Sequence, residues 1–158
     1  MMTRRDVLGF IAFLALVAVT AALGSVYTSM SIPGWYGTLA KPDWTPPAWV
    51  FGPVWTTLYL LMAVAGWLVW RPGGFRGARL GLTLFAVQLA LNVGWSLLFF
   101  GMRDPTLALA EIVALWLLIL WTTVVFWRHR PLAGVLFLPY LVWVAFAGML
   151  NAAIVAMG

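Results

Sequence analysis

The sequence predicts an all-α integral membrane protein, a bundle of five transmembrane helices in a single domain over residues 1–158. Hydrophobic residues make up 65% of the chain and charged residues only 8%, whereas charged residues are about 25% of a typical soluble domain. The apolar residues fall into five runs, each near the ~20 residues that cross a bilayer as a helix. Helices are expected in these runs because lipid cannot hydrogen-bond an open backbone.

Short polar or turn-forming segments separate the five runs. The first run follows Arg4 and Arg5, but it is longer than a signal-peptide core and four similar runs follow it, so we interpret it as a retained span. The Arg-Pro-Gly-Gly segment at 71–74 ends the second run. The last two connections are so short that the helices they join must be antiparallel. The predicted spans are residues 7–27, 48–70, 79–101, 105–127 and 132–157.

Lysine and arginine are unevenly divided between the two ends of the predicted bundle. The N-terminus and the second and fourth loops hold seven of these residues, whereas the first and third loops hold only Lys41 and Arg103. The seven are Arg4, Arg5, Arg71, Arg76, Arg79, Arg128 and Arg130. By the positive-inside rule, this bias predicts a multi-pass protein with a cytoplasmic N-terminus, and we expect a prokaryotic cell membrane. The charges form no basic stripe, so no nucleic-acid partner is expected.

The segment from Trp35 to Tyr59 differs from an ordinary loop because it combines tryptophan with proline. It contains four of the eleven tryptophans, four of the nine prolines and the only lysine. Pro42, Pro46 and Pro47 restrict the backbone and predict a stiff surface segment that leads into the second span. Two interpretations remain open: an ordered loop at the membrane–water boundary, where tryptophan is common, or a rigid aromatic lid over a binding cavity.

Three predicted spans present large aromatic rings beside amide or hydroxyl groups on one helical face. These faces consist of Trp55 and Tyr59 on the second span, Gln88, Asn92, Trp95, Ser96 and Phe99 on the third, and Tyr140, Trp143, Ala147, Leu150 and Asn151 on the fifth. Hydrogen bonds between helices, worth about 1 kcal/mol or less each, explain part of the role of Asn92 and Asn151. They explain the large rings less well, because helix packing in membranes favours small residues. The rings favour an aromatic-walled pocket for a flat apolar ligand.

A line of small residues on the third span, Ala86, Ala90 and Gly94, lies about 200° around the helix from the polar face. Such a line permits close approach of a neighbouring helix. The neighbour is either another span of the same bundle or the same helix of a second copy.

Three long motifs make the sequence similar to the TspO/MBR family, which comprises the tryptophan-rich sensory proteins and the mitochondrial translocator protein. The motifs are WY..L.KP.W.PP.WVFGPVWTTLY at 35–59, QLALN..WS..FF at 88–100 and PYL.W.AFA..LN at 139–151. The resemblance extends over all five spans. It implies a five-helix bundle, often dimeric, whose first loop caps a pocket for porphyrins, haem or benzodiazepine-type ligands. The implied pocket residues are Trp35, Trp55, Tyr59, Asn92, Trp95, Phe99, Trp143, Ala147 and Leu150, and the implied dimer contact is the line of Ala86, Ala90 and Gly94.

The end of the fifth span departs from the animal members of the family. Those members are associated with sterol binding through a Leu/Val-x-Tyr-x-Lys/Arg pattern. Here the region reads LNAAIVAMG, with no tyrosine or basic residue after Asn151. The departure speaks against a sterol as the main ligand.

Other candidate chemistry is sparse. His129 lies between Arg128 and Arg130 in a tight loop, where a solvated residue is expected rather than a haem ligand. No cysteine is available for disulfide or thiolate chemistry. We expect no metal site and no required cofactor. Glu111 is the only acid well inside a predicted span, either as a buried hydrogen-bond partner or as a proton-linked carboxylate.

Three functional hypotheses follow. The first is a membrane receptor, sensor or translocator that binds tetrapyrroles such as protoporphyrin or haem. The second is an enzyme that degrades porphyrin in light, with Trp55 and Trp143 as redox-active rings. The third is a proton-coupled exporter of small molecules that uses Glu111.

Overall fold

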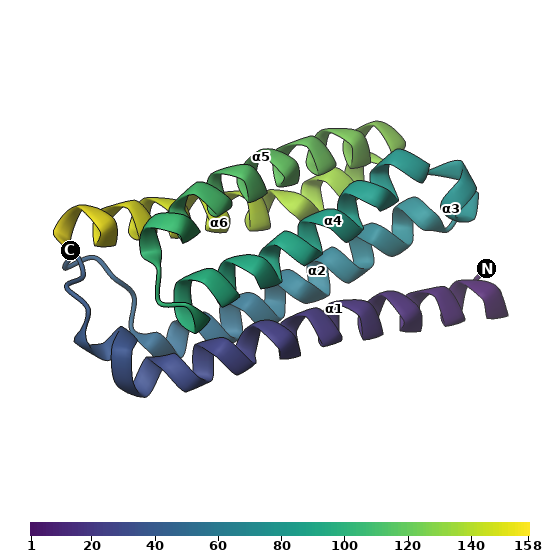
Figure 1. The fold of residues 1–158 in the computed structure, drawn as a ribbon. Coiled ribbons are helices and arrows are strands. Elements are labelled where there is room, and N and C mark those ends of the chain that lie inside the picture. Colours follow the sequence, from purple (N-terminus) through teal and green to yellow (C-terminus); the bar gives the residue numbers. More distant parts are fainter.

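The structure is a computed structural model that describes all residues from Met1 to Gly158. Its regular secondary structure is all helical, with five helices long and apolar enough to cross a membrane, as the sequence predicts (Figure 1). The long helices run roughly parallel to one axis, and the two chain termini lie at opposite ends of the bundle (Figure 1). The helical elements are α1 (Arg4–Ser31), η1 (Ile32–Tyr36), η2 (Ala48–Val50), α2 (Phe51–Trp70), α3 (Gly74–Gly77), α4 (Arg79–Ser96), η3 (Leu97–Gly101), α5 (Pro105–His129) and α6 (Pro131–Met157).

The first span is longer than predicted. The sequence analysis ends it at residue 27. In the structure α1 continues to Ser31 and then passes into the π-helical turns of η1, with Pro33 in the first turn. The wider turn tolerates a residue that has no backbone N–H to donate. The Trp/Pro-rich segment therefore begins inside a helix, and its non-helical part is confined to the residues just before η2.

The other spans lie close to their predicted positions. The second and third span Ala48–Trp70 and Arg79–Gly101, and the fifth begins one residue early, at Pro131. The fourth continues to His129, two residues beyond the predicted end. The sequence analysis did not foresee α3, a single turn in the second loop.

Polar side chains fix the starts of two spans. Thr3 and Asp6 form a capping box at the start of α1, in which each side-chain oxygen accepts the backbone N–H of the other residue, at 3.1 and 2.9 Å. At α5, Asp104 Oδ1 accepts the backbone N–H of Leu107 at 2.9 Å, and Pro105 occupies the first turn.

All seven arginines of the basic group lie at the end of the bundle that carries the N-terminus, α3 and the α5–α6 junction (Figure 1). Arg71 forms an ion pair with Asp6 at 3.4 Å, and Arg5 donates to the backbone carbonyl of Arg71 at 3.0 Å. We call this end of the molecule the packed half. The opposite end, which carries the first loop and the C-terminus, is the cavity half.

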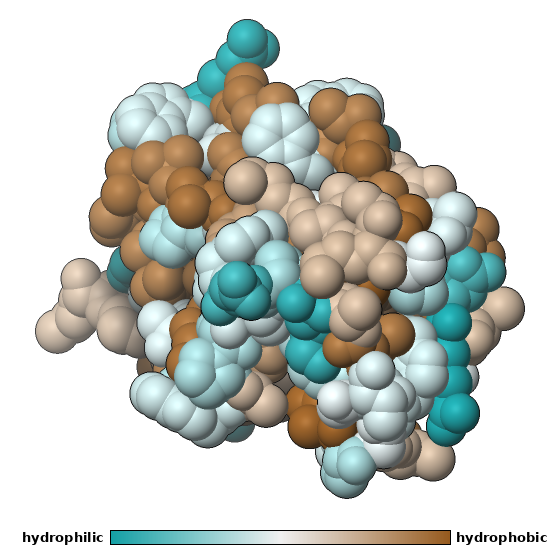
Figure 2. Space-filling view, turned by 90° about the vertical axis from the view of Figure 1, so that its left-hand side faces the viewer, coloured by the Kyte–Doolittle hydropathy of each residue, from teal (hydrophilic) through white to brown (hydrophobic).

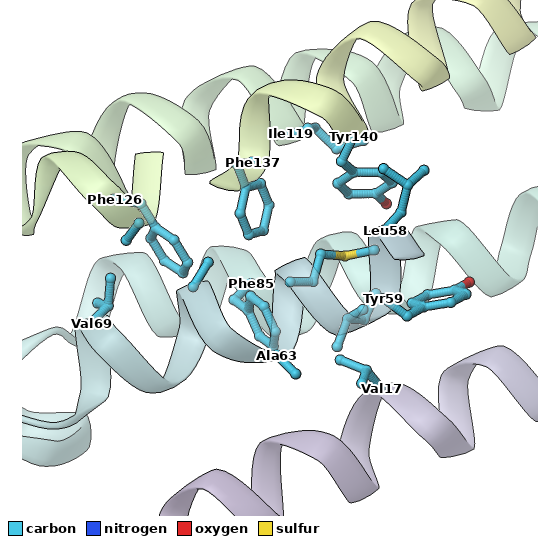
Figure 3. Packing of buried hydrophobic residues seen from close by; sticks show 14 of the residues in the cluster. Val17, Leu58, Tyr59, Ala63, Val69, Phe85, Ile119, Phe126, Phe137 and Tyr140 are labelled. Carbon is cyan, nitrogen blue, oxygen red and sulfur yellow. The ribbon is translucent and has the colours of Figure 1, made fainter. Parts of the chain in front are cut away.

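Aromatic rings fill the centre of the packed half. Phe85 of α4 stacks on Phe126 of α5 with ring centroids 6.0 Å apart, and Phe126 meets Phe137 of α6 edge-on at 5.1 Å (Figure 3). Phe126 and Phe137 are fully buried, as is Met62 of α2. On α1, Phe13 packs against the Phe85 ring at 5.7 Å and against Gly66, where an added Cβ would lie 2.8 Å from the Phe13 ring. The close approach leaves no space between α1 and α2 at this level.

Candidate functional site

A cavity of about 510 Å³ lies in the other half of the bundle, between α1, α2, α4 and α6. Its walls are mostly hydrophobic, and its lining residues come from the parts of these helices nearest the first loop. The volume falls within the range of about 300–1,000 Å³ that is usual for small-molecule sites. We call it the main cavity.

The structure brings eight of the nine predicted pocket residues together around this cavity. They are Trp55, Tyr59, Asn92, Trp95, Phe99, Trp143, Ala147 and Leu150. Trp55 and Tyr59 lie one turn apart on α2 with ring centroids 5.6 Å apart, and Trp95 stacks on Phe99 at 5.1 Å. The helical spacings that the sequence predicts therefore place large flat rings on several walls of one cavity.

The ninth residue, Trp35, is not part of the cavity wall. Because the first helix continues through η1, Trp35 lies on the turn that packs behind Phe99, with ring centroids 5.6 Å apart. The neighbouring Tyr36 lines the cavity instead. The sequence analysis placed Trp35 in the first loop, whereas in the structure it belongs to the helical turn of η1.

The wall formed by α1 was missed by the sequence analysis. This helix contributes mainly small residues: Ala18, Ala21, Gly24, Ser25 and Thr28. They carry no aromatic or amide group that marks a site in a sequence. Their role is to leave space, since a large side chain at the same level would fill the cavity. The remaining unpredicted members include Phe51, Ser96 and Phe146.

A chain of hydrogen bonds joins three helices at the inner end of the cavity. Tyr59 Oη donates to Asn92 Oδ1 at 2.8 Å, Asn92 Nδ2 donates to Tyr140 Oη at 2.7 Å, and Tyr140 Oη donates to Gln88 Oε1 at 2.7 Å. Gln88 and Tyr140 are fully buried, and only Tyr59 and Asn92 reach the cavity. The polar groups of α4 thus connect helices, which is one of the two interpretations open from the sequence.

Asn151 has a similar connecting role on the other side of the cavity. Its Oδ1 accepts the indole N–H of Trp95 at 3.1 Å, and its Nδ2 donates to the carbonyl of Pro105 at 2.8 Å. It thereby holds the Trp95 ring in place. An amide has two acceptor lone pairs and two donor hydrogens, so both Asn92 and Asn151 retain capacity for a ligand.

Two polar groups near the cavity have no hydrogen-bond partner within the protein. They are the indole N–H of Trp143 and the hydroxyl of Tyr36, both buried. Trp143 packs against Phe51 at 6.2 Å and Phe146 at 5.4 Å. A buried donor without a partner costs about 1–3 kcal/mol. A ligand with an acceptor group near Trp143 would recover this free energy.

The first loop crosses from the end of α1 to α6 and returns to α2 (Figure 1). Trp44 contacts Phe146 of α6 with ring centroids 5.7 Å apart, and Phe146 lines the main cavity. The three prolines predicted to form a lid, Pro42, Pro46 and Pro47, do not line the main cavity. They line a second hollow inside the loop itself. The prolines therefore stiffen the loop without facing the main cavity, and Trp44 makes the contact with α6.

Glu111 lies outside the main cavity, in the contact between α5 and α4. An added Cβ on Gly94 would lie 3.4 Å from Glu111 Oε1, and neither carboxylate oxygen has a hydrogen-bond partner. Gly94 therefore faces its own bundle, unlike the predicted outward line. Ala86 and Ala90 are exposed. Residues four apart advance 40° around a helix, so the row turns away from the outer face by Gly94.

His129 lies at the end of α5 in the packed half, exposed and remote from the cavity.

The fold and the cavity define a class: a polytopic membrane protein of five helices with an aromatic-walled cavity inside the bundle.

Comparison with known proteins identifies the family. The model of the TspO/MBR family matches residues 12–157, and the chain belongs to this family. It is 40% identical over 149 residues to the tryptophan-rich protein TspO of Archaeoglobus fulgidus, covering 94% of this chain and 96% of that protein. It is 40% identical over 143 residues to the translocator protein of Bos taurus, covering 89% and 85% of the two chains. It is 39% identical over 142 residues to the tryptophan-rich sensory protein of Cereibacter sphaeroides, covering 90% and 86%.

Proposed function

We propose that this protein is a membrane receptor or sensor that binds tetrapyrroles such as protoporphyrin or haem in the main cavity. The main support for this proposal is that aromatic rings from α2, α4 and α6 surround one apolar cavity of about 510 Å³. Flat aromatic ligands gain both apolar burial and ring–ring contact in such a site. The names of the relatives, translocator protein and tryptophan-rich sensory protein, agree with a receptor, sensor or translocator.

Ring contact rather than axial metal ligation supports this binding. Of the usual axial ligands of haem iron, the cavity wall has no histidine, cysteine or methionine but only Tyr36 and Tyr59, and the Tyr59 hydroxyl already donates to Asn92. The indole N–H of Trp143 provides an unused donor for an acceptor atom of the ligand. A metal-free porphyrin should therefore bind about as well as haem. Benzodiazepine-type molecules fit the same description of a flat apolar body with a few acceptors.

Purified protein titrated with protoporphyrin IX in the dark tests this proposal. Binding is expected to shift the porphyrin absorption and quench tryptophan fluorescence saturably, with unchanged porphyrin recovered afterwards. Porphyrin that partitions equally into protein-free nanodiscs and shows no saturation would contradict the proposal.

A second candidate function is light-dependent porphyrin degradation. The observation in its favour is that Trp55 and Trp143 both line the main cavity, so that two oxidisable indoles would lie beside a bound ring. Illumination should then bleach the porphyrin spectrum, and Trp55→Phe with Trp143→Phe should abolish the loss. Bleaching that continues unchanged in the double variant would assign the photochemistry to free porphyrin. The position of Glu111, outside the cavity wall, gives no comparable support to proton-coupled export.

We also propose a cytoplasmic N-terminus in a prokaryotic cell membrane, from the seven arginines at one end of the bundle, and a symmetric homodimer. The exposed small residues Ala86 and Ala90 of α4 permit close approach of a second copy. Ala90→Leu should separate the helices and yield monomers in mild detergent, while porphyrin binding is kept. Light scattering of the purified variant measures this, with Ala114→Leu on the exposed face of α5 as control. A variant that remains dimeric would place the interface elsewhere.

A further inference from the structure

A second cavity lies inside the first loop and shares one wall with the main cavity. This loop cavity has a volume of about 460 Å³ and is lined by residues of η1, the three loop prolines and Lys41. Tyr36 is the one residue that lines both cavities. Figure 2 looks onto this end of the molecule and shows small hydrophilic areas among pale and hydrophobic residues. A ligand that extends beyond the main cavity toward the loop would meet the Tyr36 ring first.

Lys41 is the charged group of the loop cavity, and its charge has no counter-ion. Its Nζ atom donates to the backbone carbonyls of Tyr36 at 2.7 Å and Leu39 at 3.2 Å, and lies 4.6 Å from the centre of the Tyr36 ring. The only ion pair in the structure joins Arg71 and Asp6 at the opposite end of the bundle. An ammonium group has three donor hydrogens, so Lys41 retains one for an anion.

Tyr36 forms the wall between the two cavities. Its side chain is only 6% exposed, wedged beside Phe99 and Phe100 at centroid distances of 6.4 and 5.6 Å. Its hydroxyl is buried without a hydrogen-bond partner, which is unfavourable. A small rotation of the ring that brings the hydroxyl to a ligand or to water would remove this penalty and join the two cavities.

We propose that the loop cavity is a subsite for an anionic group of the molecule held in the main cavity. Lys41 pairs with a carboxylate, and Tyr36 separates this charge from the apolar body of the ligand. The inference rests on the proposed function and narrows its ligand class to flat apolar molecules with a carboxylate at one edge. A carboxylate within an apolar cavity is costly unless it is paired, and Lys41 is the one lysine or arginine that lines either cavity.

The test compares protoporphyrin IX, which has two carboxylates, with its neutral dimethyl ester. Both are titrated by tryptophan quenching in nanodiscs of uncharged lipid, so that lipid charge does not contribute. The intact chain is expected to bind the diacid more tightly than the diester. Lys41→Gln should reduce this preference roughly tenfold, the size of one charged hydrogen bond, and leave diester affinity unchanged. Lys41→Arg should keep the preference.

The matched control is Arg103→Gln, which removes a positive charge outside both cavities. It should leave the preference for the diacid intact, so that a general effect of charge is distinguished from a local one. Equal affinity of the intact chain for diacid and diester would overturn the subsite while the proposed function stands. An equal loss of both affinities in Lys41→Gln would show that Lys41 only holds the loop, and would also overturn it. If neither compound binds the intact chain, the proposed function itself fails.

Discussion

The two halves of the bundle use the same kinds of residue for opposite purposes. In the packed half, Phe85, Phe126 and Phe137 contact one another and fill the interior. In the cavity half, Trp55, Trp95 and Trp143 surround an open space. Aromatic content alone therefore does not specify a binding site in this chain. The difference is made by what the rings face.

Helix α1 decides where the space begins. At the packed level it contributes Phe13, whose ring lies against Gly66 and Phe85. Further along it contributes the small residues Ala18, Ala21 and Gly24, so that no large side chain of α1 fills the space in front of the opposing rings. Between the two levels lies the hydrogen-bonded chain from Tyr59 to Gln88. Because these polar groups already have hydrogen-bond partners, they can lie buried at the inner end of the cavity without a large desolvation penalty.

The largest effect should come from emptying the packed half. Phe137→Ala removes a fully buried ring that touches Phe126 and Tyr140. We expect a loss of about 3 kcal/mol in unfolding free energy, the usual size for such a truncation. Porphyrin affinity should be kept below the unfolding transition. Thermal unfolding in detergent measures the first effect, and Leu138→Ala, at a residue 40% exposed, is the control. If Phe137→Ala lost porphyrin binding but not stability, the packed half would contribute to binding, contrary to this prediction.

The next largest effect should come from filling the cavity half from α1. Ala21→Phe places a ring in the main cavity. It should weaken porphyrin binding at least about tenfold, or 1.4 kcal/mol, with little change in stability. Ala22→Phe is the matched control because Ala22 is exposed and does not line the cavity. The two variants are compared by fluorescence titration. Similar affinities in both would mean that porphyrin binds outside the main cavity.

A smaller effect should follow from removing one wall of the cavity. Trp143→Ala removes a large ring with an unused indole donor, and we expect a loss of about 1 kcal/mol in binding free energy. Trp121→Ala on the exposed face of α5 serves as the control, since that ring is 52% exposed and outside the cavity. Unchanged titration curves in folded Trp143→Ala protein would remove this residue from the site.

The sequence was informative where a side chain has chemistry of its own. Trp55, Asn92 and Trp143 could be assigned to one cavity because ring and amide positions repeat at helical spacing. The α1 wall could not, since alanine and glycine have the same appearance whether they face a cavity, a neighbouring helix or lipid. The first span was predicted to end at residue 27, but the helix continues to Ser31 and into a π-turn that includes Pro33. Gly94 was assigned to the same helix face as Ala86 and Ala90, but each step of four residues turns the row by 40°, so that Gly94 lies beside Glu111 of α5.

The smallest effect should come from the first loop, at the outer edge of the cavity half. Pro46 and Pro47 line the loop cavity and not the main cavity, so their replacement by alanine removes stiffness without removing a ligand contact. A proline at a compatible position stabilises the folded chain by about 0.4–1 kcal/mol, because it restricts the unfolded chain. Only part of this free energy should appear in the affinity for the ligand. We expect porphyrin release to become about twofold faster, with capture unchanged, in stopped-flow fluorescence. The control is Pro72→Ala in the second loop, at the opposite end of the bundle. If the release rates of the double variant and the control agree, the first loop is a connector and the cavity is closed by the helices alone.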